Sequence, residues 1–115
     1  MTKFVQRWGS DRRLFARGHL PVPSLFFERY AQLDPPLNSG EALFVLQLMN
    51  FKWGGDAPFP SYLTIAKRMG ISVKMARIHA QNLESKRYLW REACAGRTNR
   101  FNLNPLFEAL MQRTR

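Results

Sequence analysis

The chain has 115 residues, the length of one domain, and 45% of them are hydrophobic and 13% aromatic, so it can bury a core. The composition excludes a chain that is disordered throughout, and no apolar run approaches the roughly 20 residues of a membrane helix. No secretory signal is expected, because no apolar stretch follows the basic N-terminal residues. Cys94 is the single cysteine and excludes an internal disulfide, while His19 and His79 lie too far apart in sequence to suggest zinc. We therefore expect a protein of a reducing cytoplasm that holds no metal and no cofactor.

The net charge is +10, from 18 Lys and Arg against 8 Asp and Glu, and it is unevenly distributed. Residues 1–60 hold seven basic and five acidic residues, a net +2, whereas residues 61–115 hold eleven and three, a net +8. So large an excess on a small domain attracts a polyanion, and duplex DNA is the common one. The alternative is a basic surface that only keeps the chain soluble. The charge favours nucleic acid as the partner, bound by the second half of the chain.

The first 20 residues form a segment of their own. Five Lys or Arg lie between Lys3 and Arg17, and apolar side chains flank the turn-like Gly9-Ser10-Asp11. This pattern predicts either a short hairpin or a loose basic arm. The domain that carries the function is expected over residues 21–115.

Two helices are expected ahead of the basic half. The first runs over residues 24–33, with Ser24 as its cap, and the Asp-Pro-Pro of residues 34–36 ends it. The second begins at residue 38 or 39 and ends at Gly54-Gly55-Asp56. It is apolar on almost all sides, which predicts a central position in the core.

The stretch that follows predicts two short helices joined by a tight turn. Ser61 caps a helix from Tyr62 to Met69, Gly70 suits the left-handed position that ends it, and Ser72 caps the next helix, Val73 to about Lys86. A small side chain at Ala66 lets the two helices approach closely. The apolar residues at spacings that bury one face of each helix are Ile65, Ile71, Ala76, Ala80 and Leu83.

A hairpin and a last helix complete the pattern. Strands are expected over residues 88–92 and 99–103, with Gly96 in the turn between them, and Asn104-Pro105 begins a helix that runs through Met111. A helix-turn-helix followed by such a basic hairpin predicts a winged helix-turn-helix. The expected fold is mainly α with a small β-hairpin, extended by the N-terminal hairpin or arm and the C-terminal helix.

One set of residues in this unit forms a pattern that known families share. These residues are Pro60-Ser61, Ile65-Ala66, Met69-Gly70-Ile71-Ser72, Leu83-Glu84, Lys86, Tyr88-Leu89 and Arg91. The pattern resembles the winged-helix domains of GntR-type bacterial transcription regulators. It is also similar to the amino-terminal winged helices of plasmid and phage replication initiators and of DnaD-like primosome proteins, and Val22–Leu25 and Gly96–Leu103 extend the likeness to replication proteins. The resemblance implies a DNA-binding domain of the bacterial cytoplasm, associated with the nucleoid or a plasmid.

Two positions depart from the family pattern. Arg87 stands where these families often have glycine, which predicts that the helix closes in some other way. Trp90 stands where a polar residue is usual, and we favour its packing under the wing over a contact with DNA or a partner. His79 is expected to be a structural histidine, and Cys94 to be incidental.

A recognition helix enters the major groove with its N-terminal half. Arg77 can bind guanine and Gln81 adenine through paired hydrogen bonds, on a face otherwise poor in acids, and Val73 and Ile78 can meet thymine methyls. Phosphates suit Lys74 and the start of each helix, and the arginines of the wing suit the minor groove. Lys86 and Arg68 are weaker phosphate candidates. The expected DNA contacts are Ser61, Tyr62, Lys67, Ser72, Val73, Lys74, Arg77, Ile78, Gln81, Arg91, Arg97, Thr98, Asn99 and Arg100.

Two classes of function remain open. The first is sequence-specific binding of double-stranded DNA by a transcription regulator or a replication initiator, and the second is a winged-helix module that binds proteins instead. No enzyme is expected, because the chain has no paired acids at useful spacing, no phosphate-cradling glycine loop and no nucleophile with a base. No small-molecule effector is expected either. A homodimer, joined through the segment before Pro21 and the last helix, would suit a palindromic site.

Overall fold

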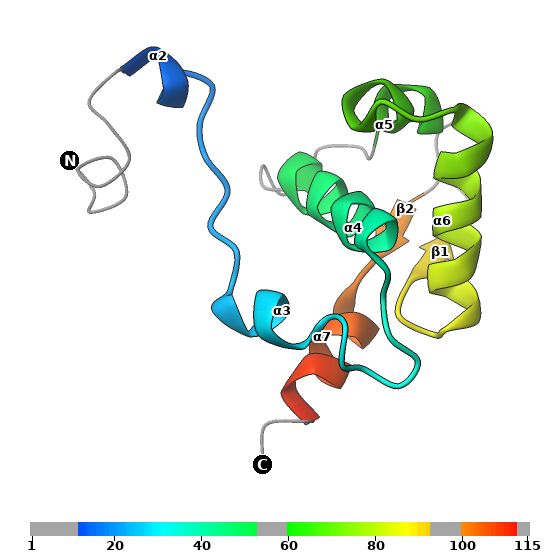
Figure 1. The fold of residues 1–115 in the computed structure, drawn as a ribbon. Coiled ribbons are helices and arrows are strands. Elements are labelled where there is room, and N and C mark those ends of the chain that lie inside the picture. Colours follow the sequence, from blue (N-terminus) through cyan, green and yellow to red (C-terminus); the bar gives the residue numbers. More distant parts are fainter. Residues whose placement is uncertain (1–11, 53–59, 93–99, 113–115) are drawn as a thin grey trace.

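A computed structural model of the chain describes residues 12–52, 60–92 and 100–112. Within these ranges no helix is both long and apolar enough to pass through a bilayer. Helices precede and follow one antiparallel hairpin, as Figure 1 shows. The elements are α2 (Arg12–Phe15), α3 (Ser24–Arg29), α4 (Ser39–Lys52), α5 (Tyr62–Met69), α6 (Val73–Ser85), β1 (Trp90–Glu92), β2 (Arg100–Asn102) and α7 (Asn104–Gln112).

Helix α4 lies at the centre of the fold, between α3 and α7 on one side and α5 and α6 on the other (Figure 1). Its residues Phe44, Val45 and Leu48 are fully buried, and α4 packs against both α5 and α6. The predicted central position is therefore confirmed. Its first turn is closed reciprocally, because the Asn38 N–H donates to the Glu41 carboxylate (3.0 Å) and the Glu41 N–H donates to the Asn38 side chain (2.8 Å).

The hairpin is anchored to this core by one of its faces. Arg91 pairs with Phe101 in the register of β1 and β2. The ring of Phe101 is buried and lies edge-on to Phe44 and Tyr62, with centroids 6.3 and 6.0 Å apart. Both strands are shorter than predicted. β1 begins only at Trp90 because Tyr88 serves to close α6, where its N–H donates to the carbonyl of Leu83 (3.0 Å).

Helix α3 differs from its prediction in both its start and its length. It ends at Arg29, and Pro23 takes the N-cap position with no side-chain cap, so Ser24 is the first helical residue rather than the cap. The chain turns back instead, since the Leu37 N–H donates to the Tyr30 carbonyl (2.9 Å). The turn still buries Leu33. The prediction that this side chain is buried is therefore confirmed, whereas the prediction that the helix extends to it is wrong.

The N-terminal segment contains a helical turn, α2, within its described part, where a hairpin or a loose arm was expected. Figure 1 shows α2 standing away from the body at the end of an extended stretch. None of its residues is buried, and the ring of Phe15 lies edge-on to His19 at 6.0 Å, within the same segment. Residues 1–11, the other part of the prediction, lie outside the described residues.

Candidate nucleic-acid interface

The two helices of the helix-turn-helix begin as the sequence predicts. The Ser61 hydroxyl accepts a hydrogen bond from the Thr64 N–H (3.2 Å), and the Ser72 hydroxyl accepts one from the Met75 N–H (3.1 Å). Between them Gly70 adopts a φ of 68°, the left-handed conformation that ends α5. Local capping chemistry therefore fixes where α6 starts and how it leaves α5.

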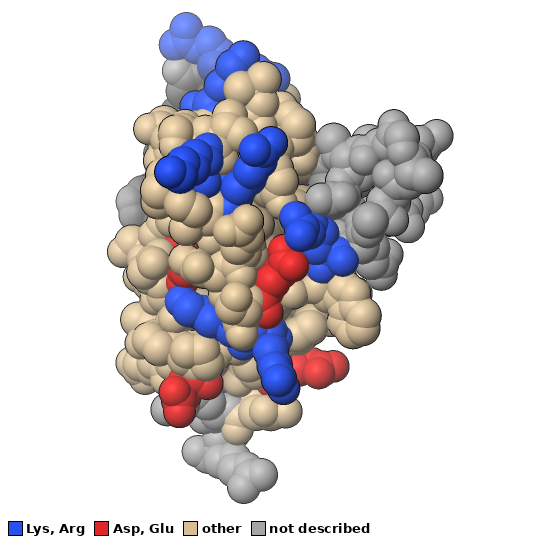
Figure 2. All heavy atoms as spheres, turned by 90° about the vertical axis from the view of Figure 1, so that its right-hand side faces the viewer, with Lys and Arg blue, Asp and Glu red and all other residues tan. Residues whose placement is uncertain are grey.

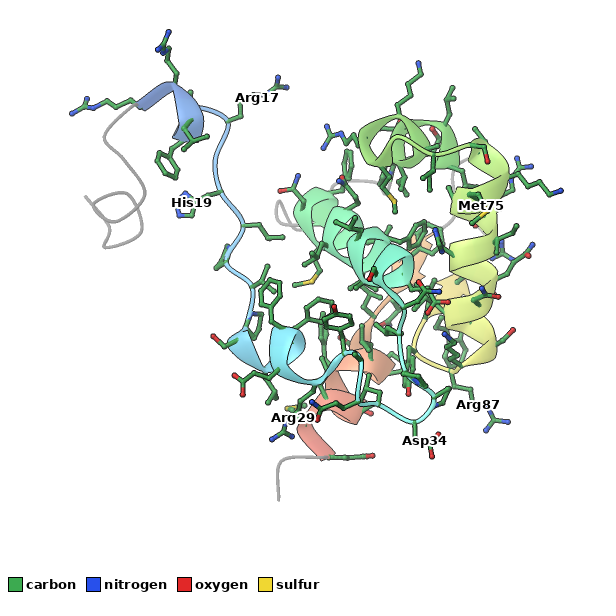
Figure 3. All side chains as sticks on the ribbon, in the orientation of Figure 1. Arg17, His19, Arg29, Asp34, Met75 and Arg87 are labelled. Carbon is green, nitrogen blue, oxygen red and sulfur yellow. The ribbon has the colours of Figure 1, made fainter. Side chains whose placement is uncertain are left out.

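The other end of α6 closes differently from the expectation. Arg87 has a φ of 66° and so takes the conformation that glycine would take. The N–H of Arg87 donates to the Glu84 carbonyl and that of Tyr88 to the Leu83 carbonyl, both at 3.0 Å. Figure 3 shows Arg87 pointing outward from this end. The prediction of another kind of closure was wrong, because burial of Tyr88 and these two bonds offset the strain of an arginine there.

One face of α6 is the buried face that the sequence predicts. Ala76, Ala80 and Leu83 have no exposed surface, and His79 is 7% exposed, a structural position as expected. Sequence reasoning missed how close α4 approaches at this point. A Cβ placed on Gly40 would lie 2.6 Å from Cε1 of His79, so only glycine allows this packing. The signal was a glycine in the first turn of α4, between Ser39 and Glu41.

The opposite face carries what we call the recognition stripe: Lys74, Arg77, Gln81 and Glu84, spaced by three, four and three residues. The first three are exposed, as predicted, and Glu84 is half-buried. The face was expected to be poor in acids, and Glu84 corrects this. Val73 and Ile78 are half-buried, and Val73 packs against the core, so both offer less surface to thymine than expected.

Four side chains meet where α5, α6 and β1 come together, and we call them the arginine cluster: Tyr62, Arg77, Glu84 and Arg91. Nη1 of Arg91 donates to the Tyr62 hydroxyl (3.2 Å), and the Arg77 guanidinium lies 5.7 Å from the Tyr62 ring centroid. Nε of Arg91 lies 3.3 Å from Oε1 of Glu84. The bond to Tyr62 raises the pKa of Arg91 further above its ordinary value, so the group is always charged. Three predicted site residues are thus brought together, with one that was not predicted.

Two weaker phosphate candidates have other partners. Nζ of Lys86 lies 2.6 Å from Oε1 of Glu41, which is fully buried, and donates to the Pro36 carbonyl (2.9 Å). Lys86 therefore holds α6 to the start of α4, and its assignment to phosphate was wrong. The Arg68 guanidinium lies over the Phe51 ring, 4.1 Å from its centroid. Lys67 and Arg68 are both exposed, and Lys67 has no such aromatic contact among the described residues.

The wing is only partly described. Trp90 is 67% exposed, so the expected packing under the wing is wrong: Phe101 from the partner strand fills the space over the core, and Trp90 pairs with Asn102 instead. The backbone of Arg100 pairs with Glu92. The predicted contacts Arg97, Thr98 and Asn99, and also Cys94, lie outside the described residues.

Basic side chains lie on the face of the molecule that α5 and α6 form. Figure 2 looks onto the side formed by α5 and α6, and basic side chains are spread along it with acidic groups between them. Among the described residues, no three acidic, histidine or cysteine side chains gather to hold a metal ion. Together the fold and this face define a winged helix-turn-helix protein.

Comparison with known proteins agrees with this class. Residues 36–89, from the turn before α4 to the start of the wing, match a family model described as a helix-turn-helix domain. The structure is similar to the crystal structure of the N-terminal domain of the DnaD protein from Geobacillus kaustophilus, with 27% identity and a TM-score of 0.70 over 99% of this chain and 90% of that one. No curated protein sequence matches significantly. The two likenesses support a DNA-binding or replication-related role.

Proposed function

We propose that the chain binds double-stranded DNA in a sequence-specific manner, with α6 in the major groove and the wing along the adjacent minor groove. The observation that carries the proposal is the recognition stripe. Lys74, Arg77 and Gln81 are exposed together on a helix whose other face is fully buried and whose two ends are closed by their own hydrogen bonds. A rigid helix that presents such donors is suited to base edges.

The proposed contacts divide into base readout and backbone positioning. Arg77 would grip guanine and Gln81 adenine, each pair being worth about 1–3 kcal/mol of discrimination. Ser61, Lys67, Ser72 and Lys74 would hold phosphates, which fix the position of α6 without reading sequence. Arg97 and Arg100 would follow the minor groove, where the potential is most negative.

The setting that we propose is replication rather than transcription. The likeness to the DnaD domain supports it, and so does the resemblance of the sequence to replication initiators. The protein would act in the bacterial cytoplasm, on a chromosome or plasmid, as a binding protein that performs no chemistry and needs no small-molecule effector.

We further propose that two copies bind together. The segment that carries α2 stands apart from the body (Figure 1), and Leu14 on it is 66% exposed. On the body, Phe27 of α3 and Met111 of α7 are 56% and 59% exposed, and α3 packs against α7. A two-fold dimer would place two recognition helices about one turn of DNA apart. A monomer in light scattering, with one half-site protected in footprinting, would contradict the dimer.

The first test is binding to a fluorescently labelled duplex at increasing salt. Contacts from several basic side chains predict a steep linear fall of log affinity with log salt. Selection of bound sites from a random duplex pool should then yield a short consensus with guanine at the position of Arg77. A pool that stays random would contradict sequence-specific binding.

One observation favours a second function, a winged helix that binds another protein. Trp90, Leu63 and Met75, all in the helix-turn-helix and wing, are 67%, 52% and 40% exposed. Exposed aromatic and methionine side chains are enriched at protein interfaces. The absence of binding to any duplex at low salt would favour this function.

A further inference from the structure

The recognition stripe ends in an acid, Glu84, which faces an arginine from the wing. Nε of Arg91 lies 3.3 Å from Oε1 of Glu84, and the two side chains are 37% and 29% exposed. This oxygen forms no hydrogen bond within the described part of the chain. Oε1 itself is shielded from water, although both side chains are partly exposed, so the pair rests on charge attraction with poor hydrogen-bond geometry. Ion pairs between partly exposed side chains are weak.

The same guanidinium is held from a second direction by a stronger contact. Its Nη1 donates to the Tyr62 hydroxyl, and the Tyr62 ring is fixed between Phe101 of β2 and the guanidinium of Arg77. Arg91 thus keeps its place when Glu84 lets go. The Glu84 carboxylate lies on the Nε side of the guanidinium, at its Nε–Nη2 edge. That planar edge is the one that grips two oxygens of a phosphate.

We propose that Glu84 is an internal counter-ion of Arg91, which occupies in the free protein the place that a DNA phosphate takes in the complex. The inference rests on the proposed DNA binding and adds its regulation. Binding exchanges a carboxylate for a phosphate at Arg91, and the freed carboxylate lies next to the anionic backbone. Both effects lower the affinity for any duplex, whereas base contacts from Arg77 and Gln81 are unaffected. Tyr62 acts as a positioning residue, which keeps Arg91 in place through the exchange.

Removal of the carboxylate should therefore tighten binding. Glu84→Gln keeps the size of the side chain and should raise the affinity for a random-sequence duplex about three- to fivefold, the range that a weak exposed pair allows. The slope of log affinity against log salt should stay nearly unchanged, because Arg91 neutralises the same phosphate in the parent and in the variant. Glu108→Gln on α7 removes the same charge from an exposed position of another element and should change the affinity by less than about twofold.

The experiment measures binding of one labelled random-sequence duplex to the full chain and its variants, with thermal unfolding as a check of folding. The Glu84→Gln gain should vanish in an Arg91→Ala background, and it should shrink in Tyr62→Phe, which keeps the ring and loses only the hydroxyl. A gain that persists without Arg91, or that Glu108→Gln reproduces, overturns the proposal. If the parent binds and Glu84→Gln binds no more tightly, this inference alone fails. If neither binds at low salt, the proposed function fails with it.

Discussion

Two ion pairs lie near the C-terminal end of helix α6, and they differ in distance and in exposure to water. Lys86 pairs with Glu41 at 2.6 Å, where the Glu41 side chain is 1% exposed, whereas Arg91 pairs with Glu84 at 3.3 Å and both side chains reach water. Around the first pair, Pro36 accepts from Lys86 and Pro35 accepts from the Tyr88 hydroxyl (2.6 Å). We call this region the anchor and define it by Pro35, Pro36, Glu41, Lys86 and Tyr88.

The difference separates two tasks on one helix. The anchor joins α6 to the loop before α4 through contacts between residues 45 to 53 positions apart, so it fixes the orientation of the helix. The arginine cluster lies at the surface, where water competes for each charge and partners can be exchanged. Substitutions in the anchor should therefore change stability, and those in the cluster should change binding. Two predictions test this division, and two more test the packing and the closure of the same helix; they are given from the largest effect to the smallest.

Lys86→Met should be the most destabilising of these changes. It leaves the buried Glu41 carboxylate without its cation, and Oε2 of that carboxylate already has no hydrogen bond among the described residues. The loss of one partner of a buried pair costs about 3 kcal/mol or more. Urea denaturation measures the effect, and Glu84→Gln, which opens the exposed pair, is the matched control with an expected change below about 1 kcal/mol. Equal losses for the two variants would remove the distinction between anchor and cluster.

Arg77→Ala should have the converse effect. The side chain is exposed, so the free energy of unfolding should change by less than about 0.5 kcal/mol. If it grips guanine, discrimination at one base position should fall by about 1–3 kcal/mol. Competition between the selected site and its single-base variants measures this loss. Lys67→Ala is the control, since the loss of a phosphate contact should weaken binding to all sites alike. An equal loss of affinity for all sites in Arg77→Ala would show that Arg77 contacts the DNA backbone rather than a base.

Gly40→Ala should lower stability by about 1 kcal/mol. The new methyl group would lie 2.6 Å from the His79 ring, and overpacking of this kind costs about 1–3 kcal/mol, partly offset by the higher helix propensity of alanine. The sign should reverse once the ring is removed. In a His79→Ala background, Gly40→Ala should be neutral or stabilising in the same denaturation assay. A loss that persists there would show that His79 is not the cause.

Arg87→Gly should produce the smallest change, a gain of about 0.5 kcal/mol. Glycine relieves the strain of a φ of 66°, and the greater freedom of the unfolded chain offsets part of the gain. Arg87→Ala removes the same charge and keeps the strain, so it should show no such gain in thermal unfolding. A gain in the alanine variant would point to charge repulsion instead.

The sequence predicts those parts of the site that depend on local chemistry. Ser61, Gly70 and Ser72 set the ends of the two helices through contacts within a few residues, and each behaves as predicted. The alanines of the buried face follow from helical spacing alone. The closure of α6 at Arg87 also depends on contacts within a few residues. It was not predicted because a left-handed conformation is unusual for arginine, although it is not impossible.

What the sequence does not predict depends on distant partners. Nothing near Lys86 reveals that it pairs with Glu41, and nothing near Trp90 reveals that Phe101 fills the space beneath the wing. Glu84 lies seven residues after Arg77, a spacing that places both on one face of the helix. Its partner, Arg91, belongs to another element and could not be predicted in this way. Such contacts arise only when the chain has folded.

Tyr62 has a consequence for engineering the protein. Its ring packs edge-on to the buried Phe101, and its other contacts hold one arginine from α6 and one from β1. The core and the binding surface thus share one side chain, and they cannot be redesigned independently through it. An attempt to retarget the domain to a new sequence should leave residue 62 unchanged and vary residues 77 and 81. Their side chains are exposed and can be exchanged without repacking the interior.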